Sequence, residues 1–91
     1  MFEATPITLD EVRGVAKRMF AGAWRLVTQT VNDRGDEGID IFFHYDKDLE
    51  EKHFRLTVPK GTVIPSISGI YFAALLVENE NRDLFGLEYE G

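Results

Sequence analysis

The sequence predicts an α+β two-layer sandwich in which an N-terminal and a C-terminal helix pack on one sheet. The sheet is expected to be mainly antiparallel, with three strands or slightly more. Three observations support this prediction: a helical apolar stripe early in the chain, a central region where apolar and polar residues alternate, and an unbroken apolar run at residues 70–77. The 91 residues suit a single domain, residues 1–91, with one core.

The first helix is predicted over residues 9–21. Thr8 and Glu11 have the spacing of a capping box, in which each side chain can bond the other's backbone at a helix start. Apolar side chains then recur at three- and four-residue spacing, and Gly22 supplies a stop. The expected inward stripe consists of Leu9, Val12, Val15, Ala16, Met19 and Phe20.

Three strands are predicted in the middle of the chain. Residues 24–31 are rich in β-branched side chains and show no helical period. Residues 39–45 and residues 53–58 alternate between apolar and polar types, with Phe42 as an apolar exception on the polar face. Because the connections are short and polar, the strands are expected to form an antiparallel meander.

The last helix is predicted over residues 69–84, followed by Gly86, the residue type that most readily adopts a left-handed C-cap. All eight residues of 70–77 are apolar, so the first two turns would be apolar nearly all round. A chain of this size has too little protein to cover both sides of such a helix. Either other parts of the chain wrap it, or a partner protein covers it.

Composition excludes several classes of function. The chain has no cysteine, which removes disulfides, thiolate nucleophiles, iron–sulfur ligation and cysteine-based zinc sites. The net charge is −6, and residues 33–51 hold eight acids against two basic side chains, so nucleic-acid binding has no electrostatic support. The longest apolar run is far too short to cross a membrane, and no signal peptide is recognisable. Any membrane association is therefore expected to be indirect.

No catalytic, cofactor-binding or metal-binding constellation can be assembled from the sequence. His44 and His53 fall on the polar faces of neighbouring predicted strands with no third ligand at a suitable spacing, so a partly exposed pair is expected. Glu80 and Asp83 share one face of the last helix, whereas Glu78 points away from Glu80. Two carboxylates are too few for a hard cation.

The last part of the chain resembles a known signature. Residues 64–86 read IPSISGIYFAALLVENENRDLFG. This is similar to the C-terminal signature of the hydrophilic 30 kDa subunit of respiratory complex I. Within that family, it is most similar to the branch that contains the small hydrophilic subunit of energy-converting, membrane-bound nickel–iron hydrogenases of the Ech type. Asn79 stands where the family usually has Arg. The sequence ends where the respiratory subunits continue with a His-Pro and paired-Arg segment, which favours the hydrogenase branch.

The resemblance implies a structural component of an oxidoreductase complex, with no cofactor and no catalytic activity of its own. It would dock on the large catalytic subunit, which in that family carries the nickel–iron centre or the quinone pocket, on the cytoplasmic side and peripheral to the membrane. In isolation, a monomer or a weak homodimer is expected. The expected interface residues are Tyr71, Phe72, Leu76, Glu78, Asn79, Glu80, Asp83, Leu84, Phe85 and Gly86. The alternative is a free-standing, homodimeric small-ligand-binding or interaction domain.

Overall fold

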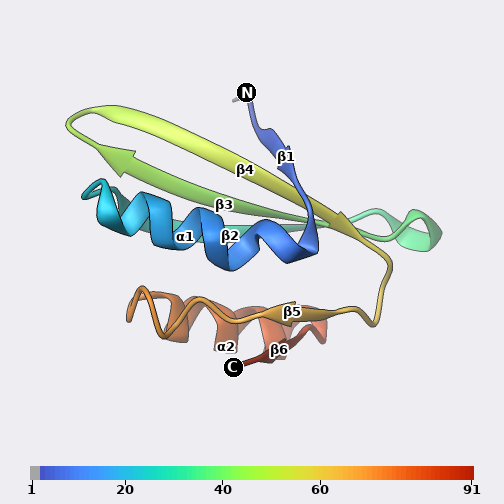
Figure 1. The fold of residues 1–91 in the computed structure, drawn as a ribbon. Coiled ribbons are helices and arrows are strands. Elements are labelled where there is room, and N and C mark those ends of the chain that lie inside the picture. The colour runs from blue at the N-terminus through green and yellow to red at the C-terminus, as the bar shows by residue number, and fades with distance from the viewer. Residues whose placement is uncertain (1–2) are drawn as a thin grey trace.

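A computed structural model describes residues 3–91 of the chain. Figure 1 shows one sheet with both helices on the same side of it, so the predicted α+β two-layer sandwich is confirmed. The elements are β1 (Thr5–Ile7), a 3-10 turn (Leu9–Glu11), α1 (Val12–Ala21), β2 (Arg25–Asp33), a second 3-10 turn (Gly35–Glu37), β3 (Ile39–Lys47), β4 (Glu50–Val58), β5 (Val63–Pro65), α2 (Ala74–Phe85) and β6 (Glu88–Glu90).

The main sheet has four strands in the order β1-β4-β3-β2. Strands β2, β3 and β4 form the antiparallel meander that the alternating pattern predicts. Strand β1 is not predicted by the sequence pattern, and it pairs in parallel with β4, with Thr5 opposite Phe54. Strands β5 and β6 form a second, two-stranded parallel sheet, in which Ile64 lies opposite Tyr89.

The first helix agrees with the prediction, except that its first turn is a 3-10 turn. The Glu11 carboxylate accepts the Thr8 backbone N–H at 2.8 Å and the Thr8 hydroxyl at 3.1 Å, and these hydrogen bonds lower the pKa of Glu11. Most of the apolar stripe is buried. Phe20 is the exception: it lies at the last turn of the helix, largely exposed, with its ring edge-on to Tyr71.

The last helix is shorter than predicted, because α2 begins at Ala74 and not at residue 69. The preceding residues form turns, in which the Ile67 carbonyl accepts the N–H groups of Ile70 and Tyr71 at 3.0 and 2.8 Å. The Ile67 side chain is fully buried and anchors this segment in the core. The helix ends as predicted: Gly86 is left-handed, with φ of 68°, and its N–H caps the Arg82 carbonyl at 3.0 Å.

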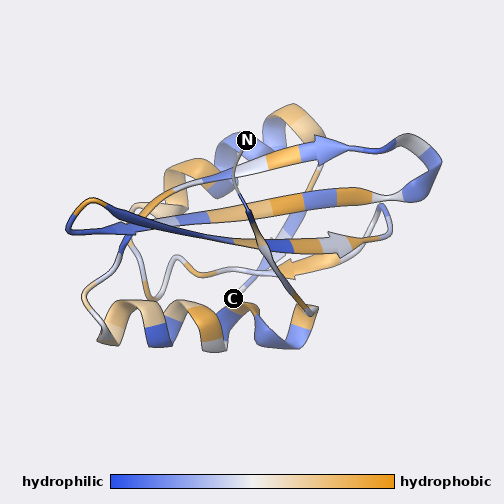
Figure 2. Ribbon diagram, turned by 90° about the horizontal axis from the view of Figure 1, so that it is seen from above, coloured by the Kyte–Doolittle hydropathy of each residue, from blue (hydrophilic) through white to orange (hydrophobic). Residues whose placement is uncertain are grey.

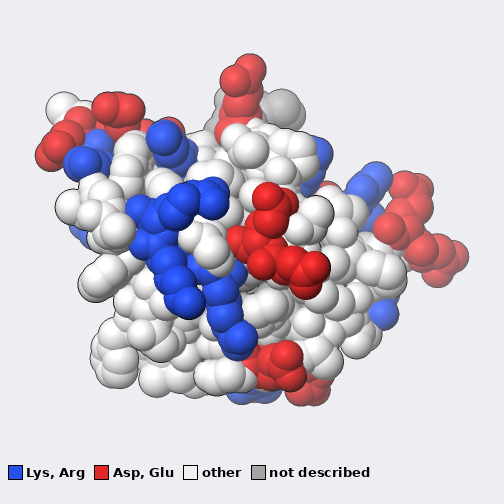
Figure 3. Space-filling view, in the orientation of Figure 1, with Lys and Arg blue, Asp and Glu red and all other residues white. Residues whose placement is uncertain are grey.

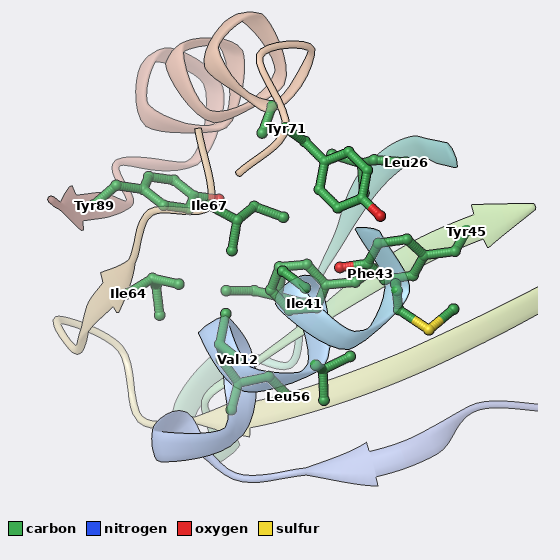
Figure 4. Packing of buried hydrophobic residues seen from close by; sticks show 14 of the residues in the cluster. Val12, Leu26, Ile41, Phe43, Tyr45, Leu56, Ile64, Ile67, Tyr71 and Tyr89 are labelled. Atoms are coloured by element: carbon green, nitrogen blue, oxygen red, sulfur yellow. The ribbon is translucent and has the colours of Figure 1, made fainter. Parts of the chain in front are cut away.

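The core lies between the sheet and the two helices (Figure 4). Ile41, Phe43 and Tyr45 project from β3 toward Val12 of α1 and Ile67 of the turn segment. Figure 2 shows hydrophobic residues interspersed with hydrophilic ones in the sheet, and hydrophobic bands on both helices. Within the described residues, no helix is long and apolar enough to cross a membrane.

Candidate docking surface

The outward side of α2 exposes more large apolar side chains than a small domain normally leaves in water. Phe72, in the turn before the helix, is 83% exposed, and Leu76 in its first turn is 76% exposed. Leu75 is partly exposed beside them, and Leu84 and Phe85 are exposed at the far end of the helix. Apolar side chains grouped in this way mark an interaction surface more often than an ordinary solvated face. We call Phe72, Leu75, Leu76, Asn79, Glu80, Asp83 and Leu84 the outer face of α2.

Acidic side chains occupy the middle and end of this outer face. Leu76, Glu80 and Asp83 follow one another at helical spacing and lie on the same side of α2, and both acids are exposed. A helix C-terminus carries partial negative charge, so carboxylates in its last turns do not stabilise the helix. Neither carboxylate pairs with a basic side chain within residues 3–91. Arg82, beside them, donates to the Asn79 side-chain oxygen at 3.2 Å and to the Tyr89 carbonyl at 3.4 Å.

Glu78, which the sequence analysis places at the interface, lies inside the chain's own core and is only 3% exposed. Its Oε1 accepts the Ser66 hydroxyl at 2.6 Å, and its Oε2 accepts the Ile67 N–H at 3.0 Å and the Gln29 amide at 3.2 Å. The physical reason is that Glu78 shares the inward side of α2 with Ala74. Its carboxylate therefore ties α2 to the preceding turn and to β2.

Tyr71 is also buried, which corrects its expected place at the interface. Its hydroxyl donates to the Trp24 carbonyl at 2.7 Å, and its ring packs against Tyr45 at 5.7 Å between centroids. The side chain fixes the start of the α2 segment to the loop after α1. It thereby leaves its neighbour Phe72 pointing outward.

A polar cluster under α2 was not identified from the sequence. The Tyr89 hydroxyl donates to the Gln29 side-chain oxygen at 3.2 Å and accepts the Asn81 amide at 3.2 Å. Burial raises the pKa of Tyr89 to about 12, so this phenol stays neutral at physiological pH. In the sequence, the only indications of this cluster are an amide side chain at Gln29 inside a β-rich segment and another at Asn81 on the inward stripe of α2. The cluster continues the Glu78 network and holds β6 against α2.

The two histidines form a hydrogen-bonded pair that is less exposed than expected. Their Nδ1 atoms lie 2.7 Å apart, His44 Nε2 is 2.9 Å from the Thr30 hydroxyl, and His53 Nε2 is 3.3 Å from a Glu51 oxygen. Burial, followed by the neighbouring His53, lowers the pKa of His44. Across residues 3–91, no group of three or more His, Cys, Asp or Glu side chains could hold a metal ion.

The exposed face of α1 separates its charges along the helix. Figure 3 shows acidic side chains beside a cluster of basic ones on the face that α1 presents, and Asp10 and Glu11 precede Lys17 and Arg18 in the chain. This order matches the helix macrodipole, which favours acids at the start and bases at the end. Arg13 turns inward and donates to the carbonyls of Ser66 and Glu90 at 3.1 and 2.6 Å. The charges on α1 are therefore explained by the helix and its packing.

Comparison with known families agrees with this architecture. The sequence model of the family described as "Respiratory-chain NADH dehydrogenase, 30 Kd subunit" matches residues 6–91, which is nearly the whole chain. A search of curated proteins found no match to the chain. Members of such a family are components of a multi-subunit oxidoreductase complex. The chain therefore belongs to the family of the 30-kDa subunit of respiratory-chain NADH dehydrogenase.

Proposed function

We propose that this chain is a cofactor-free structural subunit that binds a large catalytic subunit through the outer face of α2. The observation that supports this most strongly is the exposure of Phe72 and Leu76 in a member of a family of complex subunits. Removing one such side chain from water contributes about 1.5–3 kcal/mol. The partner is expected to offer an apolar groove for these two side chains.

The acids of the outer face define the rest of the partner surface. Glu80 and Asp83 follow Leu76 along the same side of α2 and have no basic partner within the described residues of this chain. Complementary charge fixes the register of a complex and speeds its formation. We therefore expect Arg or Lys side chains on the partner opposite these carboxylates, beside the apolar groove. Leu84 and Gly86 would complete the contact at the end of the helix.

We assign the complex to the energy-converting hydrogenase branch, on the resemblance of residues 64–86 to the small hydrophilic subunit of those hydrogenases. The respiratory NADH dehydrogenase type is the other branch of the same proposal. In either case the chain would lie on the cytoplasmic side and reach the membrane only through partner subunits. Purification of the native complex separates the branches, because the hydrogenase branch requires nickel in the large subunit.

A charge reversal tests the docking proposal. Asp83→Lys should leave the isolated fold within about 0.5 kcal/mol of wild type, because the carboxylate is exposed. In the complex it would leave the partner's donors unpaired, at a cost of about 2–5 kcal/mol. That cost corresponds to roughly 30- to 4,000-fold weaker association.

The measurement is recovery of the large subunit by tagged wild type, Asp83→Lys and the control Glu50→Lys, which reverses an exposed acid on the β3–β4 hairpin. We expect Glu50→Lys to retain the large subunit and Asp83→Lys to lose it. Equal recovery by all three would contradict docking through α2. A tight dimer of the isolated wild type that Asp83→Lys dissociates would instead show that the outer face of α2 binds a second copy.

A further inference from the structure

A pocket of about 160 Å³ lies where α2 ends. Its walls come from four separate segments of the chain, three of which supply apolar side chains. They are Val31 at the end of β2, Ile39 at the start of β3, and Phe85 and Leu87 on either side of the left-handed Gly86, with the β4–β5 loop closing one side. Ile39 and Leu87 are buried and give the pocket a fixed floor, whereas Phe85 is partly exposed at its mouth.

One carboxylate that lines this pocket, that of Asp33, makes contacts within the chain through only one of its two oxygens. Asp33 Oδ1 accepts the Gly35 N–H at 2.8 Å and forms an ion pair with Lys60 Nζ at 3.0 Å. Both interactions go to the same oxygen, which leaves Oδ2 for another donor. The hydrogen bond from Gly35, followed by the one from Lys60, lowers the pKa of Asp33, so the group is ionised at neutral pH.

The surroundings of the pocket favour a positive charge. Asp36 and Glu37 follow Asp33 in the adjoining 3-10 turn, and the nearby Arg34 is paired with Glu37 at 3.2 Å. The C-terminal end of α2 adds the partial negative charge of its last carbonyl groups. A cationic side chain could donate to the second carboxylate oxygen, Oδ2, whereas a purely aliphatic one would leave that oxygen without a donor.

We propose that this pocket receives an arginine side chain of the partner that docks on α2. The aliphatic stem would lie against Val31 and Phe85, and the guanidinium would donate to Asp33 Oδ2. Arginine suits both requirements, because its stem covers apolar surface while its planar head bonds a carboxylate and stacks on an aromatic ring. The identity of the partner rests on the function proposed above, but the chemistry of the pocket does not.

The ion pair between Lys60 and Asp33 distinguishes a ligand-binding carboxylate from a purely structural one. Lys60 and the incoming guanidinium share one carboxylate, so they compete for it. Removing the Lys60 ammonium group should strengthen arginine binding, whereas removing the Asp33 carboxylate should weaken it. Asp33→Asn retains an oxygen for the Gly35 N–H and so preserves the local turn. A merely structural role for the Lys60–Asp33 pair predicts that both variants change in the same direction.

The test is a titration of the isotope-labelled chain with the blocked peptide acetyl-Gly-Arg-Gly-amide, followed by the backbone amide signals of Gly61 and Gly86. The control peptide replaces arginine by citrulline, which has the same shape and no charge. We expect the arginine peptide to shift these signals and the citrulline peptide to bind at least about tenfold more weakly. Asp33→Asn should weaken arginine binding by a similar factor, and Lys60→Gln should bind no more weakly than wild type.

Equal binding of the two peptides to the wild-type chain would overturn the proposal, whatever the variants do. A loss with Lys60→Gln as large as that with Asp33→Asn would also overturn it. These outcomes are separable from failure of the docking proposal, because the titration needs no partner. If the peptide binds as expected while Asp83→Lys still retains the large subunit, docking through α2 is wrong and the pocket assignment stands. If Asp83→Lys releases the large subunit while both peptides bind alike, only the pocket assignment fails.

Discussion

At the scale of single residues, Glu78 and Glu80 are two positions apart and have opposite environments. The helical period separates them, but the unbroken apolar run hides which side of the helix faces inward. Only the contacts with Gln29, Ser66 and Ile67 show that Glu78 is the inward one. The sequence therefore predicts a candidate docking segment, whereas the side chains of that segment that point outward are known only from the fold.

Glu78→Gln should destabilise the chain, because an amide places an N–H₂ group where the carboxylate now accepts a hydrogen bond. The cost of leaving a buried donor unsatisfied is about 1–3 kcal/mol. The matched change Glu80→Gln on the exposed side should cost about 0.5 kcal/mol or less. Urea denaturation of the two variants measures both values. Similar losses in both would mean that the Glu78 network does not hold α2.

His44 should make stability sensitive to mild acid. Its pKa is lower in the folded chain than the ordinary value, so the unfolded chain takes up the proton first as the pH falls. The contribution is complete above about pH 6.5 and is lost as the pH falls toward the lower pKa of the folded state. The polar groups around the His44 ring come from Thr30 on β2 and from Glu51 and His53 on β4. All three residues are kept in the variant described next.

The check is the urea midpoint of wild type and His44→Gln between neutral pH and about pH 5. Wild type should lose stability in this window, and the variant should lose less. Carboxylates with lowered pKa, such as Asp46 beside Arg25, act at lower pH. A wild-type midpoint that does not change over this range would show that the histidine pair does not couple to folding.

At the scale of elements, local patterns were sufficient for α1 and the meander, but not for α2. A turn and a helical turn can have the same apolar composition, so residues 70–73 could not be distinguished from helix by sequence. The turn forms because Ile67 and Tyr71 fill space between the sheet and α1. The turn therefore depends on tertiary packing, which the local sequence pattern does not reveal.

Replacing Gly14 or Gly38 by alanine is expected to change the stability of the chain in opposite directions. A Cβ at Gly38 would lie 2.5 Å from the Val58 carbonyl oxygen, and φ there is 105°, whereas a Cβ at Gly14 in α1 would meet nothing within 4 Å. Gly14→Ala should stabilise the chain by about 0.4–1 kcal/mol. Gly38→Ala should destabilise it by at least about 1–3 kcal/mol. Melting curves decide this, at roughly 4–8 °C per kcal/mol for a domain of this size. A lower melting temperature for Gly14→Ala would argue against the packing of α1 described above.

At the scale of the whole molecule, the α+β class followed from local periodicity, and the parallel pairings did not. Strands β1, β5 and β6 have three residues each and pair with segments far away in the chain, as Thr5 does with Phe54. Such short strands leave no period to detect. The excess of apolar side chains in the last third was visible from the sequence, because no domain of this size can bury them all.

The most direct test of docking through α2 is site-specific photo-cross-linking within the assembled complex. A photoreactive phenylalanine analogue replaces Leu76 on the outer face of α2, or Leu49 at the tip of the β3–β4 hairpin. Both side chains are strongly exposed in the chain itself, so they differ mainly in location. Docking through α2 predicts a covalent adduct with the large subunit from position 76 and none from position 49. An adduct from position 49 alone would contradict it.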